Sequence, residues 1–237
     1  MKNHPFMRWL FMIAILAALT VLAKAQSLLD SGDSSGPVAI TTPVRGGLAY
    51  TRPTETTKIR NYLFDAFGPY PIASSAITAG FGQAMNSPRE WRQGAEGYSR
   101  RFTSDFTIAA VGTTTRYALS EAFKEDALYY HCECKGLLPR LGHAVISTLT
   151  ARRGEDGHRV FSIPALVAPY AGAMTAVYGW YPRRYGVRNA LRMGNYNMLE
   201  YVGANISLEF LSSAPHSLRN RLHLNNGHGA PNPGLEP

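Results

Sequence analysis

Charged side chains are scarce in this chain of 237 residues, at 17% of the total, against roughly 25% in a typical soluble domain. Long stretches rich in Ala, Glu, Lys, Leu and Arg are missing, which excludes a coiled coil. The catalytic signatures G-x-S-x-G, H-E-x-x-H and G-x-x-x-x-G-K-[ST] are missing too. Lysine and arginine are spread along the chain rather than clustered with stacking aromatics, so we expect no nucleic-acid partner.

Apolar side chains, by contrast, are plentiful. They form 45% of the chain and include 10 Phe, 3 Trp and 13 Tyr, which can supply a core and exclude disorder throughout. The formal net charge is +8. Three of the positive charges, Lys2, Arg8 and Lys24, lie in the first 25 residues, which hold no acidic side chain, so the remainder carries 8 − 3 = +5.

The first 25 residues have the three parts of an export signal in the expected order. Lys2 and Arg8 give a positive start, an apolar run covers 9–22, and Ala-Lys-Ala at 23–25 fits the small-x-small rule for cleavage. Cleavage after this triplet is favoured over an uncleaved anchor, because the run is shorter than the roughly 20 residues of a spanning helix. We therefore expect a signal peptide at 1–25 and an exported protein, in the periplasm or associated with the outer membrane.

The remaining sequence predicts one helical domain with flexible ends. Ser, Gly, Thr and Pro dominate 26–57, and turn-forming residues dominate 212–237, so we expect a flexible lead-in and a disordered tail. Residues 58–211 predict a core that is mainly α, a compact bundle of five or six helices rich in small residues. Periodicity and stop signals place helices at 58–67, 72–85, 88–123, 165–180 and 187–211.

Two parts of this core carry finer predictions. A short β-hairpin between 145–152 and 159–163, turning at 154–157, competes with a helix–turn–helix interpretation of the same segment. In the long helix at 88–123, the spacing predicts one common face. Its members are Tyr98, Phe102, Phe106, Ala109, Thr113 and Tyr117.

Two runs without a charged residue, 66–88 and 160–182, are each 23 residues long, enough to cross a bilayer. Small residues in them suit close helix contacts. These are Gly80, Gly82, Ala168, Gly172, Ala176 and Gly179. The second run ends in aromatic residues followed by Arg183 and Arg184, as is common at a membrane interface. We expect membrane association of some kind. Because the runs hold few Leu or Ile, we favour a packed bundle over spanning helices.

Both cysteines lie in the segment His131-Cys132-Glu133-Cys134. With His143, the segment offers two thiols and two imidazoles, which could bind zinc if they converged. A C-x-C pair is not the usual zinc-ligand spacing, and a disulfide across one residue closes a small, strained ring. The cysteines could instead be free thiols or form an intermolecular bridge. We favour structural cysteines, keep His131, Cys132 and Cys134 as the candidate metal or redox residues, and expect no cofactor.

Polar and aromatic groups gather between glycines at 91–101. The catalytic hypothesis is an envelope hydrolase with a polar site formed by Glu96, Arg101 and His143. The competing interpretation, which we favour, is a helix-packing motif in which glycines permit close contact and charges pair. In such a motif Arg101 and Asp105, one helical turn apart, are placed to form an ion pair.

The segments NSPREWRQGAEGYSRRF (86–102), EAFKEDALYYH (121–131) and GWYP (179–182) resemble a group of exported bacterial proteins of unassigned function, found typically in acidobacteria. The resemblance covers most of 58–211. It implies an exported bacterial protein and supplies no activity, substrate or catalytic residue. The C-x-C pair lies outside the resemblance, which weakens the metal hypothesis.

Taken together, these patterns predict an exported, membrane-associated envelope protein with a structural or interaction role, leaning away from an enzyme. Its expected partners are membrane lipid or another envelope protein, and a homo-oligomer is compatible with the small-residue helix faces.

Overall fold

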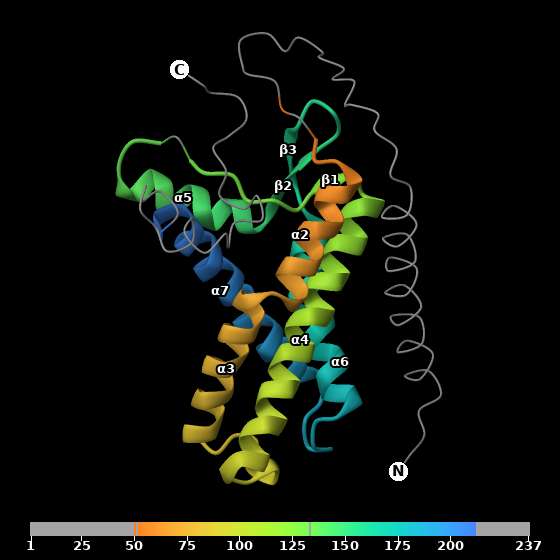
Figure 1. The fold of residues 1–237 in the computed structure, drawn as a ribbon, viewed down its shortest axis with the longest axis vertical. Coiled ribbons are helices and arrows are strands. Elements are labelled where there is room, and N and C mark those ends of the chain that lie inside the picture. The colour runs from red at the N-terminus through yellow and green to blue at the C-terminus, as the bar shows by residue number, and fades with distance from the viewer. Residues whose placement is uncertain (1–49, 51, 133, 212–237) are drawn as a thin grey trace.

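A computed structural model describes residues 50, 52–132 and 134–211 (Figure 1). Its elements, in chain order, are α2 (Glu55–Phe67), α3 (Pro69–Ala84), the 3₁₀-helix η1 (Arg89–Trp91), α4 (Gly94–Ala122), β1 (Glu125–Asp126), α5 (Leu137–Thr148), β2 (Thr150–Arg153), β3 (His158–Phe161), α6 (Ile163–Gly179) and α7 (Val187–Leu211). The predicted mainly helical core is confirmed. The predicted signal peptide at 1–25, most of the lead-in at 26–57 and the tail at 212–237 lie outside the described residues.

Helix α4 is the longest element and packs against several neighbours: α6, α3 and α2 all contact it, and α7 packs against α6 and α5. Figure 1 shows that the sheet and α5 lie at one end of α4, whereas η1 and the turn between α6 and α7 lie near the other. We call these the sheet end and the η1 end. Sites built at the two ends are therefore separated by much of the length of α4.

Hydroxyl caps fix where two of the helices begin. The Thr54 hydroxyl accepts a hydrogen bond from the Thr57 amide at the start of α2, and Ser162 does the same for Ala165 at the start of α6. Such caps satisfy amide groups that a helix leaves without partners. Helix α2 consequently begins at Glu55, inside the segment expected to be a flexible lead-in.

The helix predicted at 88–123 is interrupted, and its predicted aromatic face is not the face that is most deeply buried. Arg92 and Gly94 have positive φ angles, of 60° and 87°, which separate η1 from α4. The α4 residues that are buried are Gly97, Arg101, Ser104, Ile108, Gly112 and Ser120. The predicted aromatic face is only partly covered, because α4 meets its neighbours through small and polar side chains.

The predicted hairpin is confirmed, with a shorter first strand. Strands β2 and β3 pair antiparallel with Thr150 opposite Phe161, and β1 adds an edge in which Glu125 lies opposite Arg153. Residues 145–148, which the sequence pattern assigns to the strand, belong to α5. Gly154 and Gly157 have positive φ angles in the connecting turn, as expected for glycines at a reversal of the chain.

Helices α4 and α6 approach closely because small residues line their contact. A Cβ added at Gly172 would lie 2.3 Å from the backbone oxygen of Ile108, and one at Gly112 would lie 3.3 Å from that of Ala168. Ala168, Gly172 and Ala176 are buried, as predicted, whereas Gly80 faces open space. Within the described chain, no helix is both long and apolar enough to cross a membrane.

The interior of the bundle contains mostly small and polar side chains. Eight of its thirteen buried apolar residues are alanines, and no Leu, Phe or Met of the described segments belongs to that set. Three ionisable residues, Arg101, Glu125 and Glu209, are at most 2% exposed. Few large apolar side chains of the described residues are fully buried, and many are exposed on the outer faces of the helices.

Candidate functional site

Arg101, a predicted catalytic candidate, is a buried clamp at the η1 end. Its guanidinium donates to the backbone oxygens of Ser87, Pro88 and Arg92 at 2.7–3.0 Å and to the Gln83 side chain at 2.6 Å. All four acceptors are neutral. These hydrogen bonds hold the turn between α3 and α4 against the Arg101 guanidinium. None of these hydrogen bonds goes to Asp105, so the predicted ion pair between Arg101 and Asp105 does not form. Arg101 is 2% exposed, so its guanidinium is enclosed by these acceptors.

Asp105 does not form that ion pair, and its carboxyl group holds a proton more tightly than an ordinary aspartate does. Burial, followed by the nearby charge of Glu200 on α7, raises the pKa of Asp105 to about 7, although Arg101 opposes the shift. Burial also raises the pKa of Glu200. The charge of Glu200 therefore disfavours ionisation of Asp105.

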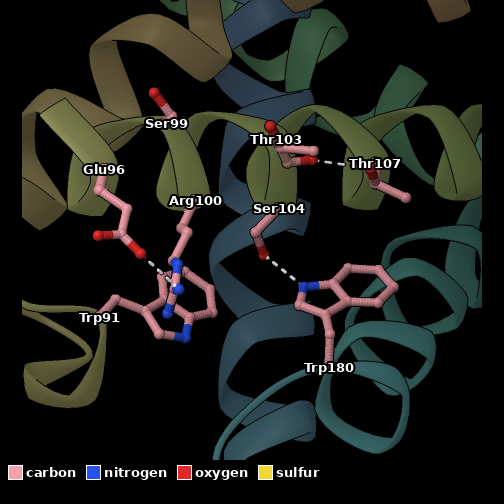
Figure 2. Close-up of a pocket in the computed structure, with 8 residues that line it drawn as sticks. All are labelled: Trp91, Glu96, Ser99, Arg100, Thr103, Ser104, Thr107 and Trp180. Carbon is pink, nitrogen blue, oxygen red and sulfur yellow. Dashed lines mark hydrogen bonds and ion pairs between the residues drawn. The ribbon is translucent and has the colours of Figure 1, made fainter.

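Glu96, the second catalytic candidate, is exposed on the first turn of α4. Its carboxylate accepts a hydrogen bond of 2.6 Å from Arg100, and both side chains are more than half exposed. Figure 2 shows this pair on one side of a hollow that also receives Trp91 and Trp180. The hollow encloses about 670 Å³.

Most of the polar side chains that line the hollow are engaged in hydrogen bonds within the molecule. The Trp180 indole donates to the Ser104 hydroxyl at 2.8 Å, and the Ser99 and Thr107 hydroxyls donate to backbone oxygens of α4 (Figure 2). Its only charged groups are the paired Glu96 and Arg100.

His143, the third catalytic candidate, belongs to α5 at the sheet end. Its Nε2 lies 3.0 Å from the backbone oxygen of Tyr130, and its ring packs edge-on against Tyr129. Because α5 and the start of α4 lie at opposite ends of the molecule (Figure 1), His143 and Glu96 cannot reach one substrate position. The predicted hydrolase site is not assembled.

The two cysteines pair with each other. Cys132 and Cys134 form a disulfide, the arrangement that the small ring size disfavours in the sequence. His131 precedes the bridge and places its Nδ1 3.3 Å from the Glu209 carboxylate. Within residues 50, 52–132 and 134–211, no three His, Cys, Asp or Glu side chains converge as metal ligands. The disulfide leaves neither sulfur as a free thiolate for zinc.

Glu209, which the sequence did not suggest, organises this region. Its side chain is fully buried near the end of α7 and accepts hydrogen bonds from the Tyr129 hydroxyl, the Cys132 amide and Arg140 Nε at 2.7–3.0 Å. Burial opposes its charge, but hydrogen bonds from Arg140 and Tyr129 outweigh burial and hold the pKa of Glu209 below its usual value. Glu209 thus ties the 129–132 segment and α5 to α7.

Strand β1 supplies two further buried carboxylates to the sheet end. Glu125 accepts hydrogen bonds of 2.6 Å from both Arg153 and the Ser162 hydroxyl. Asp126 accepts hydrogen bonds from the hydroxyls of Tyr50 and Tyr130 at 2.8 and 2.6 Å. Burial and then the charge of Asp126 raise the pKa of both tyrosines above the ordinary value. These hydroxyls remain protonated donors, so the cluster stabilises structure.

Helices α3 and α6 carry large apolar side chains on their outer surfaces. We define the α3 stripe as Tyr70, Ile77, Phe81 and Met85, and the α6 stripe as Ile163, Leu166, Val167 and Tyr178. All eight side chains are exposed, up to 64% at Phe81 and 77% at Met85. The opposite faces of these helices bury small residues, chiefly alanine, glycine and proline. A surface of this kind usually marks contact with a partner or a membrane.

No protein-family model, curated protein or solved structure matches this chain. The resemblance to exported acidobacterial proteins therefore stays a prediction, and function is inferred from the chain's own residues.

Proposed function

We propose that this protein is an exported, membrane-associated component of the bacterial cell envelope with a structural or interaction role. The observation that carries the proposal is the exposure of large apolar side chains on the outer faces of the helices. Large apolar groups occupy the outer faces of α3 and α6, and alanine, glycine and polar groups fill the interior. Exposed apolar surface is costly in water, so a surface of this extent favours a lipid or protein covering.

The arrangement of each helix supports attachment by an outer face rather than by a catalytic cleft. On α6, the buried face consists of Ala, Gly and Pro with one Val, whereas Ile163, Leu166, Val167 and Tyr178 are exposed. Helices that meet through small residues can pack closely and still present Leu, Ile and Phe to an apolar environment. The hydrolase alternative required Glu96, Arg101 and His143 to lie together, and the three side chains have separate partners instead.

Fractionation of cells that express the full chain tests the proposal. The expected result is a mature chain that begins at Gln26 and remains in the membrane pellet, with release requiring detergent or alkaline carbonate. Recovery in the soluble fraction without detergent would contradict membrane association. An N-terminus at Met1 would contradict the signal peptide alone.

A surface variant separates attachment from folding. Ile77→Ser with Phe81→Ser removes two groups of the α3 stripe that are 62% and 64% exposed, so unfolding should change little while membrane retention falls. Thr78→Ser changes an exposed polar group of the same helix and serves as the matched control. Equal retention of both variants would exclude the α3 stripe as an attachment face.

A further inference from the structure

The η1 end brings together two segments that lie far apart in the sequence, 85–100 and 178–192. An ion pair of 2.8 Å joins Glu90 to Arg184, and the rings of Trp91 and Tyr181 are in edge contact at 4.9 Å. Figure 1 shows η1 and the turn after α6 near the same end of the molecule. The two segments therefore form one surface, which we call the basic end.

This surface carries a strong excess of positive charge. Its exposed charged residues are seven arginines and two glutamates, so 7 − 2 = +5. Glu90 and Glu96 are paired with Arg184 and Arg100. The five other arginines have no carboxylate within ion-pair distance among the described residues. They are Arg89, Arg92, Arg183, Arg188 and Arg192.

Apolar and aromatic groups accompany these charges. Phe81 and Met85, at the end of the α3 stripe, lead directly into the basic end, and Tyr178 and Val187 are exposed beside it. Trp91 and Trp180 line the hollow of Figure 2. Arginines next to aromatic and apolar groups are typical of protein segments at the boundary between lipid headgroups and acyl chains.

We infer that the basic end is the membrane-contacting surface and that it recognises a bilayer containing anionic lipid. This inference rests on the proposed membrane association and specifies its orientation and lipid chemistry. The five unpaired arginines contact phosphate groups, and Phe81 and Met85 insert below them. A nucleic acid would use the same positive charge but would leave Phe81 and Met85 exposed to water, so these two side chains favour the bilayer.

Vesicle sedimentation tests the inference. The chain purified from expressing cells, with its N-terminus sequenced, is mixed with vesicles of phosphatidylcholine alone or of equal parts phosphatidylcholine and phosphatidylglycerol. We expect binding to the anionic vesicles to be the tighter, and to weaken as salt is raised, because salt screens exposed charges.

Two charge-matched variants locate the binding surface. Arg183→Ser with Arg188→Ser removes two of the unpaired arginines, and each is expected to reduce affinity for anionic vesicles about fivefold, hence about 25-fold together. Arg60→Ser with Lys135→Ser removes two exposed charges from outside the basic end, and affinity should change little. Phe81→Ser with Met85→Ser should weaken binding at high salt as well as low.

The outcomes separate the two proposals. Equal binding to both kinds of vesicle would overturn the anionic-lipid inference and leave membrane association standing. Equal losses in the two charge variants would overturn the location at the basic end. An absence of binding to either vesicle would contradict the proposed function as well. Salt-sensitive binding to duplex DNA that Phe81→Ser with Met85→Ser does not alter, without vesicle binding, would assign the surface to nucleic acid.

Discussion

The sheet end and the basic end of the molecule use charge in opposite ways. At the sheet end, Glu125 and Glu209 are buried and bound by arginine side chains. At the basic end, five arginines are exposed and have no carboxylate partner among the described residues. Buried pairs contribute to the stability of one fold, because breaking them leaves a charge without a partner. Exposed charges without partners contribute little to folding and remain available to a ligand.

Replacing Glu209 should break the sheet end most severely. Glu209→Ala leaves Arg140 and the Tyr129 hydroxyl without their buried acceptor, so we expect the free energy of unfolding to fall by about 3–5 kcal/mol. Urea denaturation followed by circular dichroism measures the change. The control is Glu96→Ala, which removes an exposed ion pair and should cost less than about 0.5 kcal/mol. Similar losses in both variants would contradict the contrast between buried and exposed pairs.

Arg101 is the exception at the η1 end, because it is buried and acts through backbone acceptors. Arg101→Met should lower the free energy of unfolding by about 2–3 kcal/mol, because it leaves buried carbonyl oxygens without donors. Arg101→Lys should recover only part of the loss, since an ammonium group lacks the planar fork of the guanidinium. Full stability in the lysine variant, in the same urea assay, would show that charge rather than geometry holds this turn.

These two residues also show what the sequence could and could not predict. Helix positions and the hairpin followed from local periodicity, caps and turn residues, which depend on near neighbours in the chain. Glu209 gave no signal, because its partners Tyr129 and Arg140 are separated from it by 80 and 69 positions. The sequence signal at Arg101 was misleading, because Asp105 lies at an ion-pair spacing from it. In the folded chain, Arg101 binds carbonyl oxygens instead.

The basic end escaped prediction for the same reason. Arg89 and Arg92 lie about 90 positions before Arg183 and Arg188, and each pair alone resembles an ordinary loop end. Only the contact of Trp91 with Tyr181 and the ion pair of Glu90 with Arg184 join them into one surface. The expectation that basic residues are dispersed describes the sequence, whereas the inferred basic end depends on contacts between distant segments.

Asp105, between the two ends, should make stability depend on pH. Its pKa of about 7 in the folded state exceeds the value of 3.8 expected when it is unfolded. The folded state therefore holds the proton more tightly, and the stabilisation present below pH 4 is lost as pH rises to about 7. The expected slope is at most about 1.4 kcal/mol per pH unit. Asp105→Asn should flatten this dependence in urea titrations at pH 5, 6 and 8, and an unchanged slope would exclude Asp105 as its source.

Arg188 gives the smallest effect on stability and the sharpest test of the contrast. It occupies the first turn of α7, where a positive charge opposes the helix dipole. Arg188→Ser should therefore leave the free energy of unfolding unchanged or raise it by about 0.3–1 kcal/mol, while binding to anionic vesicles weakens about fivefold. Stability and binding would then change in opposite directions, as expected for a charge that serves an external ligand. A fall in stability with unchanged binding would instead make Arg188 part of the folded framework.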